Sequence, residues 1–173
     1  MGWAMKRILV VEDNREIGQL LVDALTDYAP YKVISSGSGA EAMSLLELHH
    51  PDLALIDLQM PGTQGIEVGE RALALHVPVV LMTGNFAVSQ QLRLNQIPHL
   101  SKPFRISELF STVEKELAVA ATRQGMLHQS LIRLLGNMEG LTTARRSAET
   151  AAESIRRERA EPTEMSPDPD GNR

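Results

Sequence analysis

The chain has 173 residues, with 17 Lys and Arg against 22 Asp and Glu, a net charge of −5, a hydrophobic share of 43% and no cysteine. This composition suits one domain with a real core plus an extension. It argues against duplex nucleic acid as the main partner, and it excludes a disulfide framework, a thiolate zinc site and a cysteine nucleophile. No apolar run reaches the roughly 18 residues needed to span a bilayer, and residues 1–7 lead into a strand instead of forming a signal peptide. We therefore expect a cytoplasmic protein, with Met5 as a candidate natural start.

Strand-like and helix-like segments alternate through the first two thirds of the chain. In chain order they are a strand at Arg7–Val11, a helix from Glu16 to before Pro30, a strand at Tyr31–Ser35, a helix near 40–48, a strand at Leu53–Asp57, a loop at Met60–Gly65, a helix near 66–75, a strand at Pro78–Thr83, a weak helix at about Ala87–Asn95, a strand at His99–Ser101 and a helix from Arg105. Apolar residues at helical spacing indicate the helices. The third strand is almost wholly apolar, which suits burial on both faces, whereas the second suits an edge. Five such βα units predict an α/β fold with a doubly wound five-stranded parallel sheet and helices on both faces.

Polar side chains stand where four of these strands end. They are Glu12 with Asp13, then Asp57, Thr83 and Lys102. The carboxyl ends of parallel strands meet at one edge of a sheet, where open α/β folds bind their ligands. Three carboxylates at that edge favour a hard cation, and a carboxylate can also attack phosphorus. Taken singly, Asp13 reads as a helix cap, Thr83 as a strand-end residue and Lys102 as a surface charge, so the combination carries the prediction.

Four short stretches together resemble the receiver domain of two-component response regulators. They are Val10–Asn14, Ile56–Gly62, Met82–Gly84 and Ser101–Phe104, and the resemblance covers roughly residues 6–117. It implies the strand order 2-1-3-4-5. It also implies a cis peptide bond between Lys102 and Pro103, since cis bonds are essentially confined to proline.

The resemblance implies a role for each residue at this edge. Asp57 would accept a phosphoryl group from a phosphohistidine on a histidine kinase or histidine phosphotransfer protein. Mg²⁺ would be held directly by Asp13 and Asp57, by Glu12 through water and by the backbone carbonyl of Gln59. Lys102 would pair with Asp57 and later with a phosphoryl oxygen, and Thr83 would donate its hydroxyl to another.

The segment between Thr83 and Lys102 departs from the family. It is shorter than usual, Gln96-Ile97 replaces the usual Gly-Ala, and His99 stands where most receivers carry an aromatic switch residue. We therefore expect a short fourth helix and question the usual dimer through the fourth helix, fifth strand and fifth helix. His99 is either a planar, pH-sensitive switch partner of Thr83 or an ordinary, partly exposed strand histidine.

Apolar residues recur at heptad spacing from Ile106 to Leu141, a run that continues past residue 117 and predicts a helical, coiled-coil-like extension over 118–160. Its apolar seam needs a helical partner, which is a second copy, another protein or a hairpin at Gly136 or Gly140. Residues 161–173 are predicted to be a disordered tail.

The leading interpretation is a phosphorelay response regulator that switches protein–protein contacts with a downstream protein target. It catalyses only its own phosphotransfer and dephosphorylation. A constitutive dimeric scaffold with a degenerate switch is the main alternative. A transcriptional regulator using the basic C-terminal helix is disfavoured, because its Arg residues are interleaved with acids. A Mg²⁺-dependent hydrolase would need a second carboxylate shortly after Asp57, where Gln59 stands.

Overall fold

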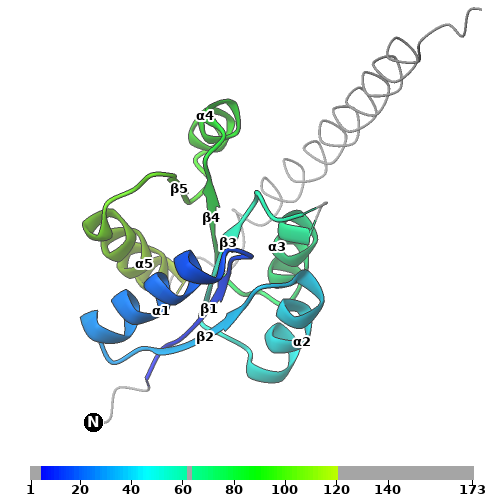
Figure 1. Cartoon of the computed structure of the whole chain (residues 1–173), viewed down its shortest axis with the longest axis vertical. Coiled ribbons are helices and arrows are strands. Elements are labelled where there is room, and N and C mark those ends of the chain that lie inside the picture. The colour runs from blue at the N-terminus through cyan, green and yellow to red at the C-terminus, as the bar shows by residue number, and fades with distance from the viewer. Residues whose placement is uncertain (1–4, 62–63, 121–173) are drawn as a thin grey trace, which may run out of the picture. The chain divides into compact units, whose positions relative to one another are not determined.

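Strands and helices alternate along the chain in a computed structural model that describes residues 5–61 and 64–120 (Figure 1). The elements are β1 Arg7–Val11, α1 Arg15–Tyr28, β2 Lys32–Ser36, α2 Gly39–His49, β3 Leu53–Asp57, α3 Gln64–Ala74, β4 Val79–Thr83, α4 Phe86–Leu94, β5 His99–Ser101 and α5 Ile106–Ala120. The predicted tail and the extension beyond residue 120 lie outside the described residues, so the division into 6–117, 118–160 and 161–173 stays a prediction.

The five strands form one parallel sheet in the order β2-β1-β3-β4-β5. The predicted doubly wound α/β fold and its strand order are thus confirmed. Every residue of β3 and β4 is buried, as expected for central strands, and β2 lies at an edge with partly exposed side chains. Because all strands run the same way, their last residues gather at one edge of the sheet.

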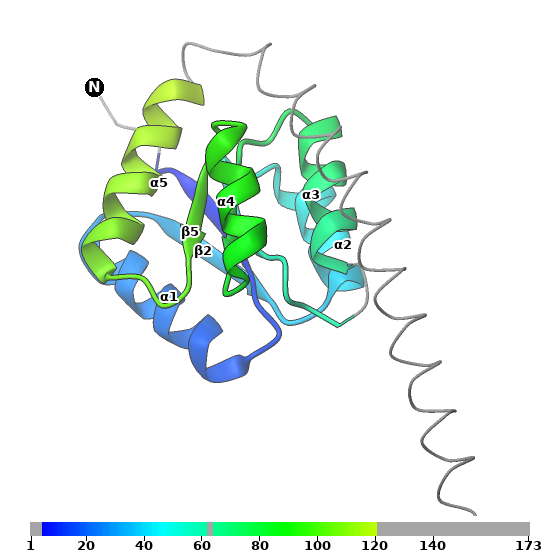
Figure 2. The ribbon, with the colours of Figure 1, turned by 90° about the horizontal axis from the view of Figure 1, so that it is seen from above.

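Two apolar layers hold helices against the two faces of the sheet. Successive side chains of a strand point to opposite faces, so Ile8 and Val10 pack with α1 and α5 whereas Leu9 and Val11 pack with α2, α3 and α4. Figure 1 shows α1 and α5 on one side of the sheet, and α2 and α3 on the other. In Figure 2, α4 runs alongside β5 at the edge of the sheet.

Asparagine caps start two helices directly after polar strand ends. The side chain of Asn14 accepts hydrogen bonds from the backbone N–H groups of Glu16 and Ile17, and that of Asn85 accepts one from Val88. Such caps stabilise a helix by about 1 kcal/mol relative to Ala. Only a few residues separate each strand end from the capped helix that follows, so the backbone of these residues has little freedom.

The predicted loop at Met60–Gly65 was wrong at its end, because α3 already begins at Gln64. A Cβ atom at Gly65 would lie 2.2 Å from the backbone oxygen of Asp57, so only glycine lets the first turn of α3 pack this closely on the end of β3. The fourth helix is short, with nine residues, as the shortened segment predicts. None of the helices in residues 5–61 and 64–120 is long and apolar enough to cross a membrane.

Candidate functional site

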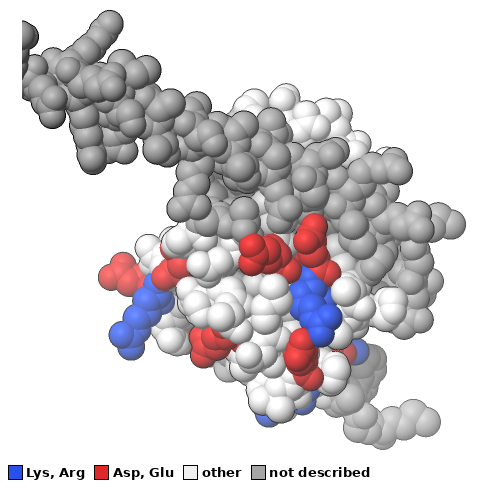
Figure 3. Space-filling view, turned by 90° about the vertical axis from the view of Figure 1, so that its right-hand side faces the viewer, with Lys and Arg blue, Asp and Glu red and all other residues white. Residues whose placement is uncertain are grey.

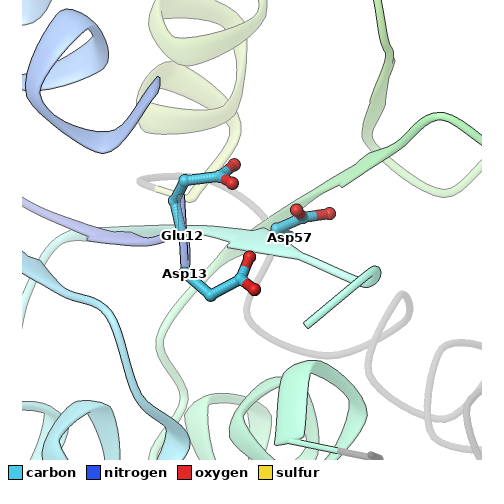
Figure 4. Close-up of side chains that lie close together, drawn as sticks. All are labelled: Glu12, Asp13 and Asp57. Atoms are coloured by element: carbon cyan, nitrogen blue, oxygen red, sulfur yellow. The ribbon is translucent and has the colours of Figure 1, made fainter. Parts of the chain in front are cut away.

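Three carboxylates meet at the carboxyl edge of the sheet. Glu12 and Asp13 follow β1, and Asp57 is the last residue of β3, the strand paired with β1. One oxygen of each lies within 4.8 Å of the others, and Figure 4 shows the three side chains converging on the same space. Glu12 and Asp57 are 4% and 3% exposed, whereas Asp13 is open to solvent. The site is therefore a largely buried acidic pair with one solvent-facing carboxylate beside it.

Lys102 is the cation of this site. Its Nζ donates to Asp57 Oδ2 at 2.7 Å and to Glu12 Oε2 at 2.6 Å. Its backbone N–H donates to the carbonyl of Thr83, which holds the end of β5 against β4, and the Lys102–Pro103 peptide bond is cis. Sequence reasoning paired Lys102 with Asp57 alone, and the contact with Glu12 is new.

One ammonium group therefore serves two buried carboxylates. The pKa of Glu12 is raised, chiefly by burial and further by the charge of Asp57, although the Lys102 hydrogen bond offsets part of this. Burial alone would lower the pKa of Lys102, but its hydrogen bonds to Asp57 and Glu12 raise it overall. With Asp13 included, the site carries surplus negative charge. The atoms that could bind a metal ion are carboxylate oxygens, the ligands that Mg²⁺ prefers.

Thr83 ends the neighbouring strand β4 and is 1% exposed. Strand β4 pairs with β3 so that Met82 stands opposite Asp57, which places Thr83 at the same edge. The Thr83 Oγ1 atom accepts a hydrogen bond from the backbone N–H of Asn85 at 3.1 Å. A hydroxyl that accepts in this way keeps its own hydrogen available for a ligand.

Gln59 contributes more than its backbone. Its N–H donates to Asp57 Oδ1 at 2.9 Å, and its side-chain Oε1 accepts from the backbone N–H of Gly84 at 2.6 Å. This second bond connects the loop after β3 with the loop after β4. Sequence reasoning assigned only the Gln59 carbonyl, and no sequence pattern marks where its side chain turns.

His99 lies half-buried on β5, and its hydrogen-bond partners are not the carboxylates of the site. Its Nδ1 lies 2.8 Å from the carbonyl oxygen of Ile97 and its Nε2 lies 3.2 Å from Ser89 Oγ. Ser89, buried on α4, also hydrogen-bonds the Ser101 hydroxyl, one residue before Lys102. A carbonyl only accepts, so Nδ1 carries a hydrogen and Nε2 of the neutral ring accepts from Ser89. Ser89, which sequence reasoning missed, thus connects α4 to both His99 and Ser101.

The described basic residues do not gather into one patch on the face drawn in Figure 3. Their blue side chains stand apart from one another there, with red acidic side chains beside them. Nucleic-acid backbones are bound by clustered Lys and Arg, and this face offers no such cluster among the residues described.

Comparison with known proteins gives consistent results for the described domain. The response regulator receiver domain family matches residues 8–114. The polar-differentiation response regulator DivK of Brucella ovis is 32% identical over 122 residues, covering 66% of this chain and 98% of DivK. The transcriptional regulatory protein PdtaR of Mycobacterium tuberculosis is 32% identical over 123 residues, covering 69% of this chain but 59% of PdtaR. A CheY-like receiver domain protein of Methanospirillum hungatei superposes with a TM-score of 0.61 at 24% identity, covering 68% and 98% of the two chains.

Proposed function

The chain belongs to the response regulator receiver domain family, and from this membership we propose that Asp57 is the residue that accepts its phosphoryl group. Proteins of this family act in two-component phosphorelay signalling, so the chain is a signalling receiver and not a conventional enzyme. One observation carries the assignment to Asp57. Asp57 is buried at the end of β3, paired with Lys102, and close to the carboxylates of Glu12 and Asp13.

In the proposed step a carboxylate oxygen of Asp57 forms a bond to phosphorus while the P–N bond of a phosphohistidine breaks. The electron pair of that bond stays on the imidazole nitrogen, and the donor leaves as neutral histidine once it takes a proton from solvent. The donor would be a histidine kinase or a histidine phosphotransfer protein. Hydrolysis of the acyl phosphate would return free Asp57. The receiver itself is proposed to catalyse both reactions.

Mg²⁺ fits the donor set of this site, which is made of oxygens and carries surplus negative charge. The proposed ligands are Asp13 and Asp57 directly, Glu12 through water and the backbone carbonyl of Gln59. When bound, the ion would neutralise the charge of the approaching phosphoryl group and of the carboxylates. Because the ion binds only the folded site, 100-fold excess over its dissociation constant would add about 2.7 kcal/mol of stability.

Lys102 and Thr83 are proposed to hold two phosphoryl oxygens. Lys102 already contacts Asp57, so its ammonium lies beside the atom that phosphorus would join. Thr83 has a hydroxyl hydrogen available at the same edge. A shift of Thr83 toward the phosphoryl group would move β5, whose Ser101 and His99 are tied to α4 through Ser89. His99 is thereby proposed as the switch residue that follows Thr83.

The phosphodonor protein is proposed to dock where α1 and α5 begin, because both helices start next to the site. Each exposes an apolar side chain in its first half, Leu20 at 60% and Ile106 at 40%. The output is proposed to be a protein contact. The heptad pattern from Ile106 to Leu141, which continues into the extension predicted over 118–160, supports a homodimer or a contact with a downstream protein target. The proposed location is the cytoplasm, where the ATP that supplies histidine kinases is found.

The test is to incubate the full chain with Mg²⁺ and acetyl phosphate and to measure added mass by intact mass spectrometry. One phosphoryl group is expected on wild type and none on Asp57→Ala. Asp52→Ala is the matched control, since Asp52 lies at the other end of β3 and should leave the adduct in place. Light scattering on the same samples reports whether the adduct changes assembly.

The constitutive scaffold remains the second candidate, favoured by the short α4 and by His99 in place of an aromatic residue. A wild-type chain that forms no adduct, yet is dimeric without phosphodonor, would support it over the switch. PdtaR is named as a transcriptional regulatory protein. A transcriptional role for this chain would require DNA binding with a steep salt dependence.

A further inference from the structure

A side-chain hydrogen bond closes one wall of the acidic site. The backbone N–H of Gly84 donates to Gln59 Oε1 at 2.6 Å. Gln59 lies two residues after Asp57, and Gly84 follows Thr83 at the end of β4. Since β3 and β4 are paired with Asp57 opposite Met82, the two loops leave the same edge of the sheet side by side. The bond therefore spans the gap between them beside Asp57.

A phosphoryl group on Asp57 would need hydrogen-bond donors for its three terminal oxygens. Lys102 Nζ and the Thr83 hydroxyl are two donors at this edge. The N–H of Gly84 is a third, fixed by the backbone, and fixed backbone N–H groups are frequent phosphate ligands. In the unphosphorylated protein this third donor is already taken by the amide oxygen of Gln59.

We propose that Gln59 is a positioning residue whose side-chain oxygen occupies the Gly84 N–H in place of a phosphoryl oxygen, and that it must leave before the phosphoryl group is fully bound. This inference rests on the proposed phosphorylation of Asp57 and adds a residue that opposes it. Gln59 also holds the loop after β3 to the loop after β4, so its release separates the two loops when the phosphoryl group arrives. The amide thus weakens phosphoryl binding and couples that binding to movement of the loop that leads into α4.

The geometry at Gly84 offers a second, independent way to break the bond. A Cβ atom built there would lie 2.7 Å from Gln59 Oε1 and 3.6 Å from its Cδ. Gly84→Ala would therefore push the amide away while it keeps the N–H donor in place. Because the atom in the way is the tip of an exposed, flexible side chain, the substitution leaves the backbone free to stay where it is.

The experiment measures the affinity of the full chain for beryllofluoride, a phosphoryl analogue, at saturating Mg²⁺, and the rate of phosphorylation by acetyl phosphate. In the latter reaction a bond forms between Asp57 and phosphorus, and acetate leaves with the electrons of the broken P–O bond. Gln59→Ala is expected to bind beryllofluoride about fivefold more tightly and to phosphorylate faster, since one competing hydrogen bond is removed. Gln59→Met, which keeps the length but loses the oxygen, is expected to do the same.

Gly84→Ala should match these variants, and the double variant Gln59→Ala/Gly84→Ala should gain no more than either single change. Mg²⁺ affinity should be unchanged in Gly84→Ala, because the proposed metal ligands are untouched. Gln90→Ala, an exposed glutamine on α4, is the control and should behave as wild type.

Two outcomes overturn the inference. If Gln59→Ala speeds phosphorylation but Gln59→Met does not, side-chain bulk and not the hydrogen bond is responsible. If the gains of the two sites add in the double variant, they act independently. Failure of the proposed function looks different, because wild type itself would then take up neither beryllofluoride nor a phosphoryl group.

Discussion

Strand β3 has an aspartate at each end, Asp52 just before its first residue and Asp57 as its last. Each contacts a lysine at 2.7 Å, Asp52 with Lys6 and Asp57 with Lys102. The pairs differ in their surroundings. The side chains of Lys6 and Asp52 are 50% and 35% exposed, whereas those of Lys102 and Asp57 are 19% and 4% exposed. Distance alone would call these contacts equivalent, and burial makes them different.

At the Asp52 end, charges and donors are matched. Partial burial alone would raise the pKa of Asp52, but the backbone N–H of Arg7 and the ammonium of Lys6 outweigh it, so the pKa lies below its ordinary value. Asp52 connects the start of β1 to the start of β3, and its contacts stabilise its ionised form. This end of the strand stabilises the sheet.

At the Asp57 end, one ammonium is divided between Asp57 and Glu12, and the pKa of Glu12 is raised by burial and by Asp57. The fold thus keeps two buried carboxylates on a single ammonium, an excess of negative charge. Such a site is ready for a cation and an electrophile. The functional end of β3 is therefore recognised by its uncompensated charge, not by the presence of an ion pair.

Removal of each lysine in turn should separate the two ends of β3 most strongly. Lys102→Met should lower the free energy of unfolding by about 3–5 kcal/mol in Mg²⁺-free buffer, because two buried carboxylates lose the one counter-charge that the described residues give them. Lys6→Met should cost less than about 1 kcal/mol, as is usual for exposed pairs. Urea titrations of both variants give the two values, and equal losses would contradict the contrast in burial.

Replacing the aspartates should give effects of opposite sign. Asp57→Asn is expected to stabilise the Mg²⁺-free protein by about 1 kcal/mol, because relief of repulsion with Glu12 exceeds the weakened Lys102 contact. Asp52→Asn is expected to destabilise it by about 1 kcal/mol, after discounting for solvent exposure.

The pH dependence of Asp52→Asn checks the same point. A carboxyl whose pKa is lowered on folding contributes stability above its unfolded pKa, near 3.8, and loses it as the pH falls through the folded value. The difference in free energy of unfolding between wild type and Asp52→Asn should therefore be largest at pH 7 and should shrink as the pH falls below 3.8. Destabilisation by Asp57→Asn in the same buffer would refute the idea of uncompensated charge.

The sequence was sufficient to predict most of the fold, because apolar runs mark the strands and Asp57, Thr83 and Lys102 stand at their ends. Parallel strands bring such residues to one edge without further information. The start of α3 was missed because Gly65 reads as a loop residue, while its role is to let a helix approach Asp57 closely. A close approach between two segments has no local signal.

Side-chain partners were the least predictable part of the site. The contact of Lys102 with Glu12 and the bond from Gly84 to Gln59 join residues that are 90 and 25 positions apart. Each depends on which rotamer a flexible side chain adopts once the strands are in register. Ser89 was missed for the same reason, since a serine within an amphipathic helix pattern does not reveal that it faces His99.

Glu116 on α5 is a carboxylate outside both ends of β3. It is 7% exposed and has no ion pair or hydrogen bond among the described residues. Burial raises its pKa, and the neighbouring Lys115 lowers it only in part. A carboxyl with a raised folded pKa stabilises the protein below its unfolded pKa, near 4.5, and this contribution is lost as the pH rises through the folded value. Glu116→Gln, which cannot ionise, should therefore match wild type in stability near pH 4 and exceed it by about 0.5 kcal/mol at pH 7, a size usual for changes outside the core network. Thermal unfolding across this pH range measures the difference. Phosphorylation of Asp57 in the same variant should be unchanged, because Glu116 lies on α5 and is not one of the clustered carboxylates Glu12, Asp13 and Asp57. A gap that narrows with rising pH would show that Glu116 has a cationic partner and resembles Asp52 instead.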